Sequence, residues 1–141
     1  MSQGSLFDSK DLVVYFDGGS RGNPGEAAIG AVVRDAARDE PLVTISERIG
    51  VATNNVAEYR ALIAGLEAAS QHGGGRLIVR GDSQLVLKQL RGEYKVRNVG
   101  LRPLYDEARK LLRRFDDVTL EHVRREQNVD ADTLVNAALD A

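Results

Sequence analysis

The chain has 141 residues, a net charge of −2 and no cysteine. Its length favours one domain with a real hydrophobic core, and 43% hydrophobic with 28% charged residues is typical of a soluble globular protein. The missing cysteine excludes disulfides and thiolate metal sites, and no apolar run is long enough to span a bilayer. Since residues 1–11 also lack the blocks of a signal peptide, we expect a cytoplasmic protein, and separately we expect it to be a monomer.

Short apolar runs separated by turn residues predict three strands at the start of the domain. They span 12–17, 27–34 and 42–49, with a glycine-rich turn segment at 18–25 and a polar turn at 35–40. Connections this short indicate an antiparallel meander. Residues 1–11 are polar, and we expect them to form a mobile tail ahead of one domain at 12–141.

Helices and strands alternate in the remaining sequence. Thr53 and Asn54 are suitable N-caps for a helix that reaches about residue 71, and its alanines allow close packing on a sheet. A strand at 76–80, helices at 83–90 and 101–115, a strand at 118–123 and a helix at 131–139 follow. The order βββαβααβα predicts an α/β fold: a five-stranded mixed sheet, its first three strands antiparallel, with helices on its faces.

Four carboxylates stand at strand ends and first helical turns. Asp17 ends the first strand, Glu58 lies early in the long helix, Asp82 follows the fourth strand and Asp132 opens the last helix. Each has an ordinary explanation: a turn residue for Asp17, the helix dipole for Glu58 and Asp132, and an N-cap for Asp82. Together they suit a hard divalent cation, which binds oxygen ligands. We expect them to share a pocket, where like charges would raise at least one pKa.

Four sequence motifs in order carry a resemblance to a known family. They are DGGSRGNPG at 17–25, TNNVAE at 53–58, GDSQ at 81–84, and REQN at 125–128 leading to Ala131 and Asp132. On these residues the chain resembles the type 1 ribonuclease H family in its compact archaeal and bacterial form. The resemblance implies a ribonuclease H-like fold and an endonuclease that hydrolyses the RNA strand of RNA–DNA hybrids. It implies a two-metal-ion mechanism with Mg²⁺ or Mn²⁺ that leaves 5′-phosphate and 3′-hydroxyl ends.

The resemblance also assigns roles to individual residues. Asp17 would bridge two ions, Glu58 and Asp82 would hold one of them, and Asp132 would hold the other. Contacts with the substrate would fall on Asn23, Thr53, Asn54, Asn55 and Gln84. Amide and hydroxyl groups suit this task because they hydrogen-bond phosphates, base edges and the 2′-hydroxyls that distinguish RNA from DNA.

The sequence departs from longer members of this family in three places. Longer members carry a histidine in the loop before the last acid, but the loop before Asp132 holds none. We expect Arg125 to take the place of that histidine, because the nearby His122 falls within a predicted strand. The segment 92–101 stands where longer members have a basic protrusion, and we expect its Lys95 and Arg97 to bind the hybrid. There is no tryptophan to line a channel for the DNA strand. The acidic net charge still permits a basic face, because nine cationic residues lie between positions 88 and 114.

Two other functions are compatible with the same fold. One is a catalytically silent module that binds hybrids, since a fold does not guarantee chemistry. The presence of all four acids argues against it. The other is a related two-metal nuclease or transposase-like domain that acts on DNA. The Asn54–Asn55 pair and the absence of added domains favour the hybrid nuclease.

The tail contains a pattern of its own. Leu6 and Phe7 are adjacent large apolar residues in a polar segment, which solubility explains poorly. With Gln3 they resemble the short peptide by which bacterial replication and repair proteins bind the sliding clamp. The alternatives are that Leu6 and Phe7 pack on the body of this protein, or that the tail is a cloning remnant.

Overall fold

The computed structural model describes residues 11–38 and 40–141. The elements are β2 (Leu12–Gly22), β3 (Gly25–Asp35), β4 (Pro41–Ala52), α1 (Asn54–Ser70), β5 (Arg76–Gly81), α2 (Gln84–Leu90), α3 (Arg102–Leu112), β6 (Asp117–His122), the short 3-10 helix η1 (Arg125–Gln127) and α4 (Val129–Asp140). Their order is the predicted one. The tail residues Gln3, Leu6 and Phe7 lie outside the described residues. No helix in the described ranges is long and apolar enough to cross a membrane.

The five strands form one mixed sheet in the order β4-β3-β2-β5-β6. β2 and β3 pair antiparallel, as do β3 and β4, whereas β5 runs parallel to both β2 and β6. The predicted fold class is therefore confirmed, including the antiparallel arrangement of the first three strands.

The first strand does not end where the sequence predicted. We expected a turn throughout 18–25, but β2 continues to Gly22 and β3 begins at Gly25, so only Asn23 and Pro24 connect them. Gly22 still serves the turn with a φ of 99°, but Gly18 serves packing instead. A Cβ atom at Gly18 would lie 2.1 Å from the carbonyl carbon of Ala57, so only glycine lets α1 approach β2 this closely.

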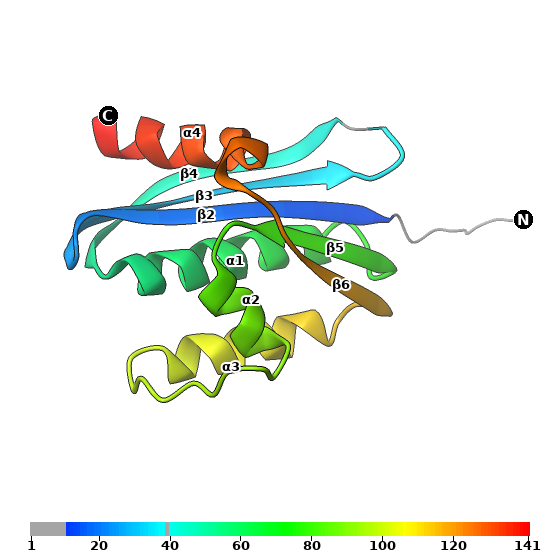
Figure 1. Cartoon of the computed structure of the whole chain (residues 1–141). Helices are drawn as coiled ribbons and strands as arrows, with labels where there is room; N and C mark the ends of the chain where they lie inside the picture. Colours follow the sequence, from blue (N-terminus) through cyan, green and yellow to red (C-terminus); the bar gives the residue numbers. More distant parts are fainter. Residues whose placement is uncertain (1–10, 39) are drawn as a thin grey trace, which may run out of the picture.

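The sheet carries helices on both faces (Figure 1). α1 covers one face, where the even-numbered residues of β2 join a core that includes Phe16, Leu62 and Leu66. α4 covers the other face, and Val135 packs there in a smaller cluster with Ala28 of β3. α2 and α3 lie beyond α1 in the same view. Side chains from both helical layers can therefore meet only where the sheet is interrupted.

Candidate active site

Such an interruption occurs along one edge of β2. β2 pairs with β3 as far as Gly22, but with β5 only as far as Phe16. Backbone groups beyond Phe16 on the β5 side need other partners, because unpaired groups in a protein interior are costly. Side chains of α1 supply two of them. The N–H of Gly18 donates to Glu58 Oε1 at 2.9 Å, and the N–H of Ser20 donates to Asn54 Oδ1 at 3.3 Å.

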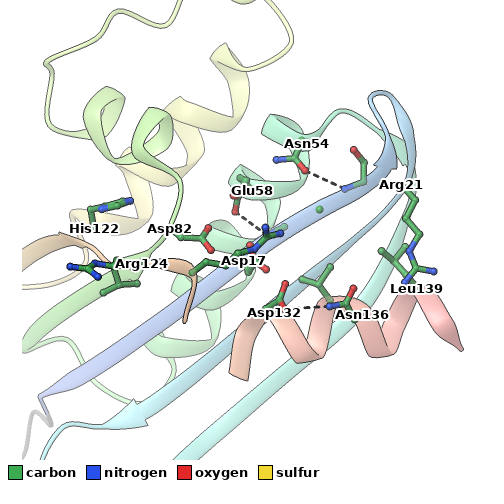
Figure 2. Close-up of a pocket in the computed structure, with 16 residues that line it drawn as sticks. Asp17, Arg21, Asn54, Glu58, Asp82, His122, Arg124, Asp132, Asn136 and Leu139 are labelled. Carbon is green, nitrogen blue, oxygen red and sulfur yellow. Dashed lines mark hydrogen bonds between the residues drawn. The ribbon is translucent and has the colours of Figure 1, made fainter. Parts of the chain in front are cut away.

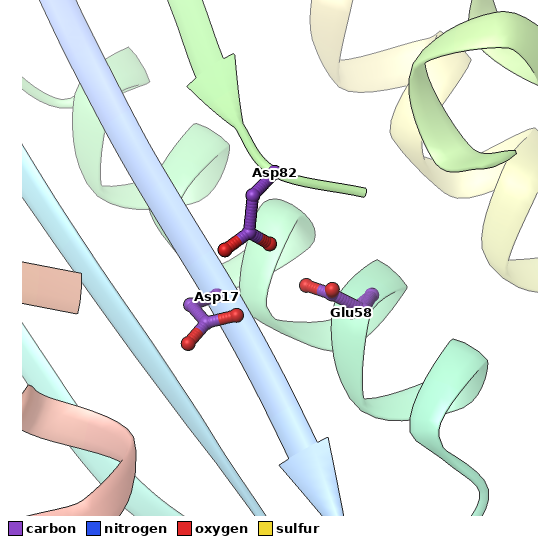
Figure 3. A group of neighbouring side chains, drawn as sticks. All are labelled: Asp17, Glu58 and Asp82. Atoms are coloured by element: carbon purple, nitrogen blue, oxygen red, sulfur yellow. The ribbon is translucent and has the colours of Figure 1, made fainter. Parts of the chain in front are cut away.

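Three predicted acids converge on this open edge. Asp17 lies one residue past the last pair with β5, Asp82 directly follows β5, and Glu58 projects from α1. One carboxylate oxygen from each lies within 4.8 Å of the others, and Figure 3 shows the three groups facing one another. Asp17 and Glu58 are only 8% and 5% exposed. The N-cap explanation of Asp82 is wrong, because Ser83 caps α2 by accepting from the N–H of Val86.

The fourth acid reaches the same cavity from the other helical layer. Asp132 lies in the first turn of α4, and the Nδ2 group of Asn136 donates to its carboxylate at 3.4 Å. All four acids line one cleft of about 460 Å³ (Figure 2). The ordinary explanations from the helix dipole do not account for this shared cleft.

Burial and neighbouring charges perturb the two buried acids, Asp17 and Glu58. Burial raises the pKa of Asp17 from its ordinary 3.8 to about 7, and the charges of Asp82 and Asp132 add to the rise. Burial also raises the pKa of Glu58 well above its ordinary value, with Asp17 contributing, while the N–H of Gly18 opposes the rise. A raised pKa was expected, but burial rather than like charge is the larger cause. A divalent cation would supply the missing positive charge.

Six of the eight predicted substrate residues divide into two groups. Asn54 and Arg125 line the cleft with the acids. The other four, Asn23, Thr53, Asn55 and Gln84, do not line it, although the first two lie next to Asn54. Asn23 Oδ1 accepts from the N–H of Asn54 at 3.0 Å, and Thr53 Oγ1 caps α1 by accepting from the N–H of Val56 at 3.2 Å.

Lys95 and Arg97 lie elsewhere, in the connection between α2 and α3. They line a second cavity of about 390 Å³ together with Tyr94, Arg102 and Tyr105. Lys88 Nζ lies 5.0 Å from the centroid of the Tyr94 ring, and that ring is half exposed. Tyr94 was not among the predicted residues, although its position next to Lys95 in a loop was a signal for nucleic-acid contact. An exposed ring among cations can stack on a base.

The cleft also contains residues that the sequence analysis did not assign to it. These are Arg21, His122, Arg124 and Asn136. His122 is the last residue of β6 and lines the cleft, so its place in a strand did not remove it from the site. Its position just before the loop that leads to Asp132 could have indicated this.

Comparisons with known proteins place the chain in a family. The family model described as "Reverse transcriptase-like" matches residues 15–138. The ribonuclease HI of Halobacterium salinarum is 51% identical over 127 residues, which cover 89% of this chain and 63% of that protein. A bifunctional protein of Mycobacterium tuberculosis is 47% identical over 92% of this chain but only 36% of its own length. This chain therefore spans about a third of the mycobacterial relative and less than two thirds of the halobacterial one.

Solved structures agree with the sequence matches. The N-terminal ribonuclease H domain of that mycobacterial protein superposes with a TM-score of 0.89 at 46% identity, covering 92% of this chain and 99% of the domain. The ribonuclease H1 called LC11, crystallised in complex with an RNA/DNA hybrid, has a TM-score of 0.85 at 40% identity and covers 92% and 96%. The sheet order, the helical layers and these matches lead to one conclusion: the chain belongs to the type 1 ribonuclease H family.

Proposed function

We propose that this chain is an endonuclease that hydrolyses the RNA strand of RNA–DNA hybrids and leaves 5′-phosphate and 3′-hydroxyl ends. The observation that carries the proposal is the cluster of Asp17, Glu58 and Asp82, with three carboxylate oxygens within 4.8 Å and Asp132 in the same cleft. The relative crystallised with a hybrid, at 40% identity, supports the choice of substrate.

The cluster fits Mg²⁺ or Mn²⁺, because its donors are all carboxylate oxygens and its buried members carry raised pKa values. Asp17, Glu58, Asp82 and Asp132 would hold the ions. When bound, two such ions activate a water and stabilise the leaving oxygen of a phosphodiester. The choice between the two metals belongs to the proposal and to its test.

The protein's own part is to hold these oxygens in place. The N–H of Gly18 orients the Glu58 carboxylate, and the Asn136 amide orients that of Asp132. Burial of Asp17 and Glu58 keeps bulk water away from the cluster. Arg125 faces it with positive charge and partly offsets the rise in the pKa of both buried acids. An arginine at this position can hydrogen-bond a phosphate of the substrate.

Recognition of the hybrid would use the two cavities for its two strands. Asn54 presents a side chain at the cleft, held by its bond to Ser20, and suits the 2′-hydroxyls of the RNA strand. Asn23, Thr53 and Asn55 adjoin it, and Gln84 is exposed at the start of α2. Lys95 and Arg97 would contact phosphates of the DNA strand, with Tyr94 as a stacking surface.

The test is cleavage of three labelled duplexes, RNA–DNA, DNA–DNA and RNA–RNA, in Mg²⁺, in Mn²⁺ and in EDTA. We expect metal-dependent cleavage of the hybrid's RNA strand, with 5′-phosphate on the products. Binding of the hybrid without cleavage supports the silent module instead. Cleavage of duplex DNA in preference to the hybrid supports the DNA nuclease.

We also propose a partner for the tail, on sequence alone. Leu6 and Phe7 would fill an apolar pocket of the sliding clamp and Gln3 would hydrogen-bond at its edge, ordering a short segment at modest affinity. A peptide spanning residues 1–11 should bind the host's clamp in a fluorescence titration, and the Leu6→Ala, Phe7→Ala peptide should not. Equal binding by the two peptides, or none at high micromolar concentration, rejects this partner.

A further inference from the structure

Asp132 differs from the other acids in how it reaches the cleft. Asp17 is part of β2, Asp82 follows the strand paired with β2, and Glu58 is bonded to β2 through Gly18. Asp132 belongs to α4, which follows after the chain has passed through β6 and η1 to the other face of the sheet (Figure 1). The distance from Asp17 to Asp132 therefore depends on what holds α4 against β2.

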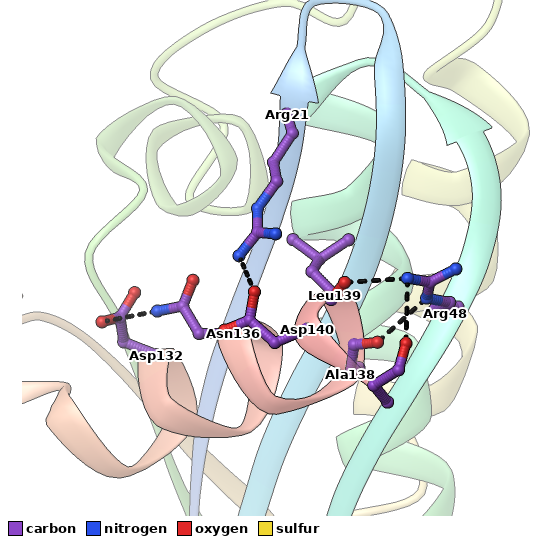
Figure 4. Close-up of polar contacts among 8 residues, drawn as sticks. Arg21, Arg48, Asp132, Asn136, Ala138, Leu139 and Asp140 are labelled. Atoms are coloured by element: carbon purple, nitrogen blue, oxygen red, sulfur yellow. Dashed lines mark hydrogen bonds and ion pairs between the residues drawn. The ribbon is translucent and has the colours of Figure 1, made fainter.

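Several anchors of α4 bind it to the far strand β4 instead. Ser46 Oγ donates to the carbonyl of Leu134 at 2.6 Å. The Arg48 guanidinium donates to the carbonyls of Ala138 and Leu139 at 2.9 and 2.8 Å, as Figure 4 shows. Arginine suits this place because the last carbonyls of a helix lack donors within the helix. These contacts keep α4 on the sheet but touch neither β2 nor the acids.

An ion pair links α4 to β2 at the end farthest from Asp132 along the helix. Arg21 of β2 lies 2.7 Å from Asp140, the last residue of α4 (Figure 4). Both side chains are more than half exposed. Exposed pairs of this kind contribute little to stability, so this contact cannot set the geometry of the cleft.

Asn128 makes the buried contact near the acids. The side chain is 1% exposed, and its Nδ2 group donates to the carbonyl of Phe16 at 2.9 Å. Phe16 directly precedes Asp17 and is the last residue of β2 that pairs with β5. The backbone carbonyl of Asn128 accepts from the N–H of Asp132 at 3.1 Å. One residue is thus bonded to the main chain beside Asp17 and to the main chain of Asp132.

Helix capping does not explain this side chain. Asn128 stands at the N-terminus of α4, where asparagine usually accepts from a helical N–H, but it makes no such bond. Its Oδ1 atom is buried and has no hydrogen-bond partner among the described residues. A buried acceptor without a partner costs stability. The amide is therefore retained for its donor, and that donor goes to Phe16.

We propose that Asn128 is a positioning residue that sets the spacing of Asp17 and Asp132 through its bond to the Phe16 carbonyl. The proposal rests on the proposed function, since it takes these acids to hold the cations used in hydrolysis. Without the bond, Ser46 and Arg48 still hold α4 on β4 and Arg34 of β3 still pairs with Asp130 in its first turn, but the buried bond from this turn to β2 is lost. The catalytic step should then suffer more than hybrid binding, because all the proposed substrate contacts except Arg125 lie on elements away from Asn128.

The test compares Asn128→Leu, which keeps the volume and removes the donor, with the wild-type protein. We expect kcat on the hybrid to fall by about tenfold or more and KM to stay within about twofold, since small misplacements of catalytic groups are costly. Calorimetric titration of Mn²⁺ into the protein without substrate should show affinity weakened several-fold. Unchanged kcat and unchanged Mn²⁺ affinity would overturn the proposal.

Ser46→Ala is the matched control, because it removes a hydrogen bond to the same helix away from the acids. Ser46→Ala should lower Tm by about as much as Asn128→Leu does, and it should leave kcat within about twofold of the wild-type value. Equal loss of kcat in both variants would mean that Asn128 acts only through stability. If Asn128→Leu does not fold, a measurement on the wild-type protein still tests the proposal. One Asn128 side-chain amide proton should exchange slowly with solvent in ¹H–¹⁵N spectra and shift on Mg²⁺ addition, and a fast-exchanging amide rejects the proposal.

Failure of the proposed function would be distinguishable from failure of this inference. A wild-type protein that cleaves no hybrid in either metal refutes the function. The Mn²⁺ titrations and the amide exchange rate would still report whether Asn128 holds the two acids together.

Discussion

Asp17→Asn should stabilise the metal-free protein at alkaline pH, although it removes a proposed catalytic group. The pKa of Asp17 is about 7 in the folded protein against an ordinary 3.8. Between these values the folded state keeps a proton that the unfolded chain has released. Stability therefore falls as pH rises from about 4 to about 7, and the loss is complete above the folded pKa.

The size of this loss follows from the two pKa values. Their difference is 7 − 3.8 = 3.2, and each pKa unit corresponds to about 1.4 kcal/mol, so ionised Asp17 destabilises the folded state by about 4 kcal/mol. Asparagine has a similar shape and no charge. We expect Asp17→Asn to raise the free energy of unfolding by about 2 to 4 kcal/mol at pH 8, or Tm by about 6 to 15 °C.

Urea unfolding in EDTA at pH 4 and pH 8 measures this effect. The gain should appear at pH 8 and be small at pH 4, where the wild-type carboxyl is protonated. Glu93→Gln, which neutralises an exposed acid outside the cleft, is the control and should change little at either pH. A variant no more stable than wild type at pH 8, or equally stabilised at both pH values, would refute the reasoning.

Three further predictions concern the cleft and the basic loop. Asp82→Asn should nearly abolish cleavage in Mg²⁺ yet leave a folded protein by circular dichroism that still binds hybrid by fluorescence anisotropy; wild-type turnover would remove Asp82 from the site. Mg²⁺ or Mn²⁺ should raise Tm above its value in EDTA, since only the folded cluster binds the ion, and identical melts at metal levels that support cleavage would argue against a preformed site. The double variant Lys95→Ala, Arg97→Ala should raise KM more than it lowers kcat. It should also reduce the slope of log binding affinity against log salt concentration by the amount expected for about two lost phosphate contacts. An unchanged slope would mean that other cationic residues contact the phosphates.

The sequence predicted the order of the elements because that information is local. β-branched runs such as LVVYF and RLIVR, and the cap at Thr53, act within a few residues of themselves. The end of β2 was missed for the opposite reason. Residues 18–22 look like a turn in isolation, and only the antiparallel pairing with β3 makes them a strand. Glycine's intrinsic preference was overridden by a contact formed at long range.

The candidate site could be predicted residue by residue for the acids but not for what holds them. Asp17, Glu58, Asp82 and Asp132 stand out because each is an acid at a strand end or near the start of a helix. Asn128 has no such signal, since an asparagine before a helix is ordinarily a cap. Its role depends on the open edge of β2 and on the path of the chain across the sheet.

Gly18→Ala tests whether the close packing of α1 on β2 shapes the site. An added Cβ would lie 2.1 Å from the carbonyl carbon of Ala57 and 2.4 Å from the nitrogen of Glu58, and both are backbone atoms that cannot rotate away. α1 must therefore shift, and the bond from the Gly18 N–H to Glu58 should lengthen or break. We expect a loss of about 2 to 4 kcal/mol in urea unfolding, at or above the usual cost of overpacking.

Gly19→Ala provides the comparison, since its Cβ would meet only Val135 Cγ1, at an ordinary 3.5 Å. That variant should lose less than about 1 kcal/mol. Mn²⁺ titration completes the test: Gly18→Ala should bind the ion more weakly than Gly19→Ala, because displacing α1 carries Glu58 away from Asp17 and Asp82. If Gly18→Ala is as stable as Gly19→Ala and binds Mn²⁺ equally well, α1 does not pack on β2 as closely as described. The open edge of β2 would then not be what brings Glu58 to the cluster.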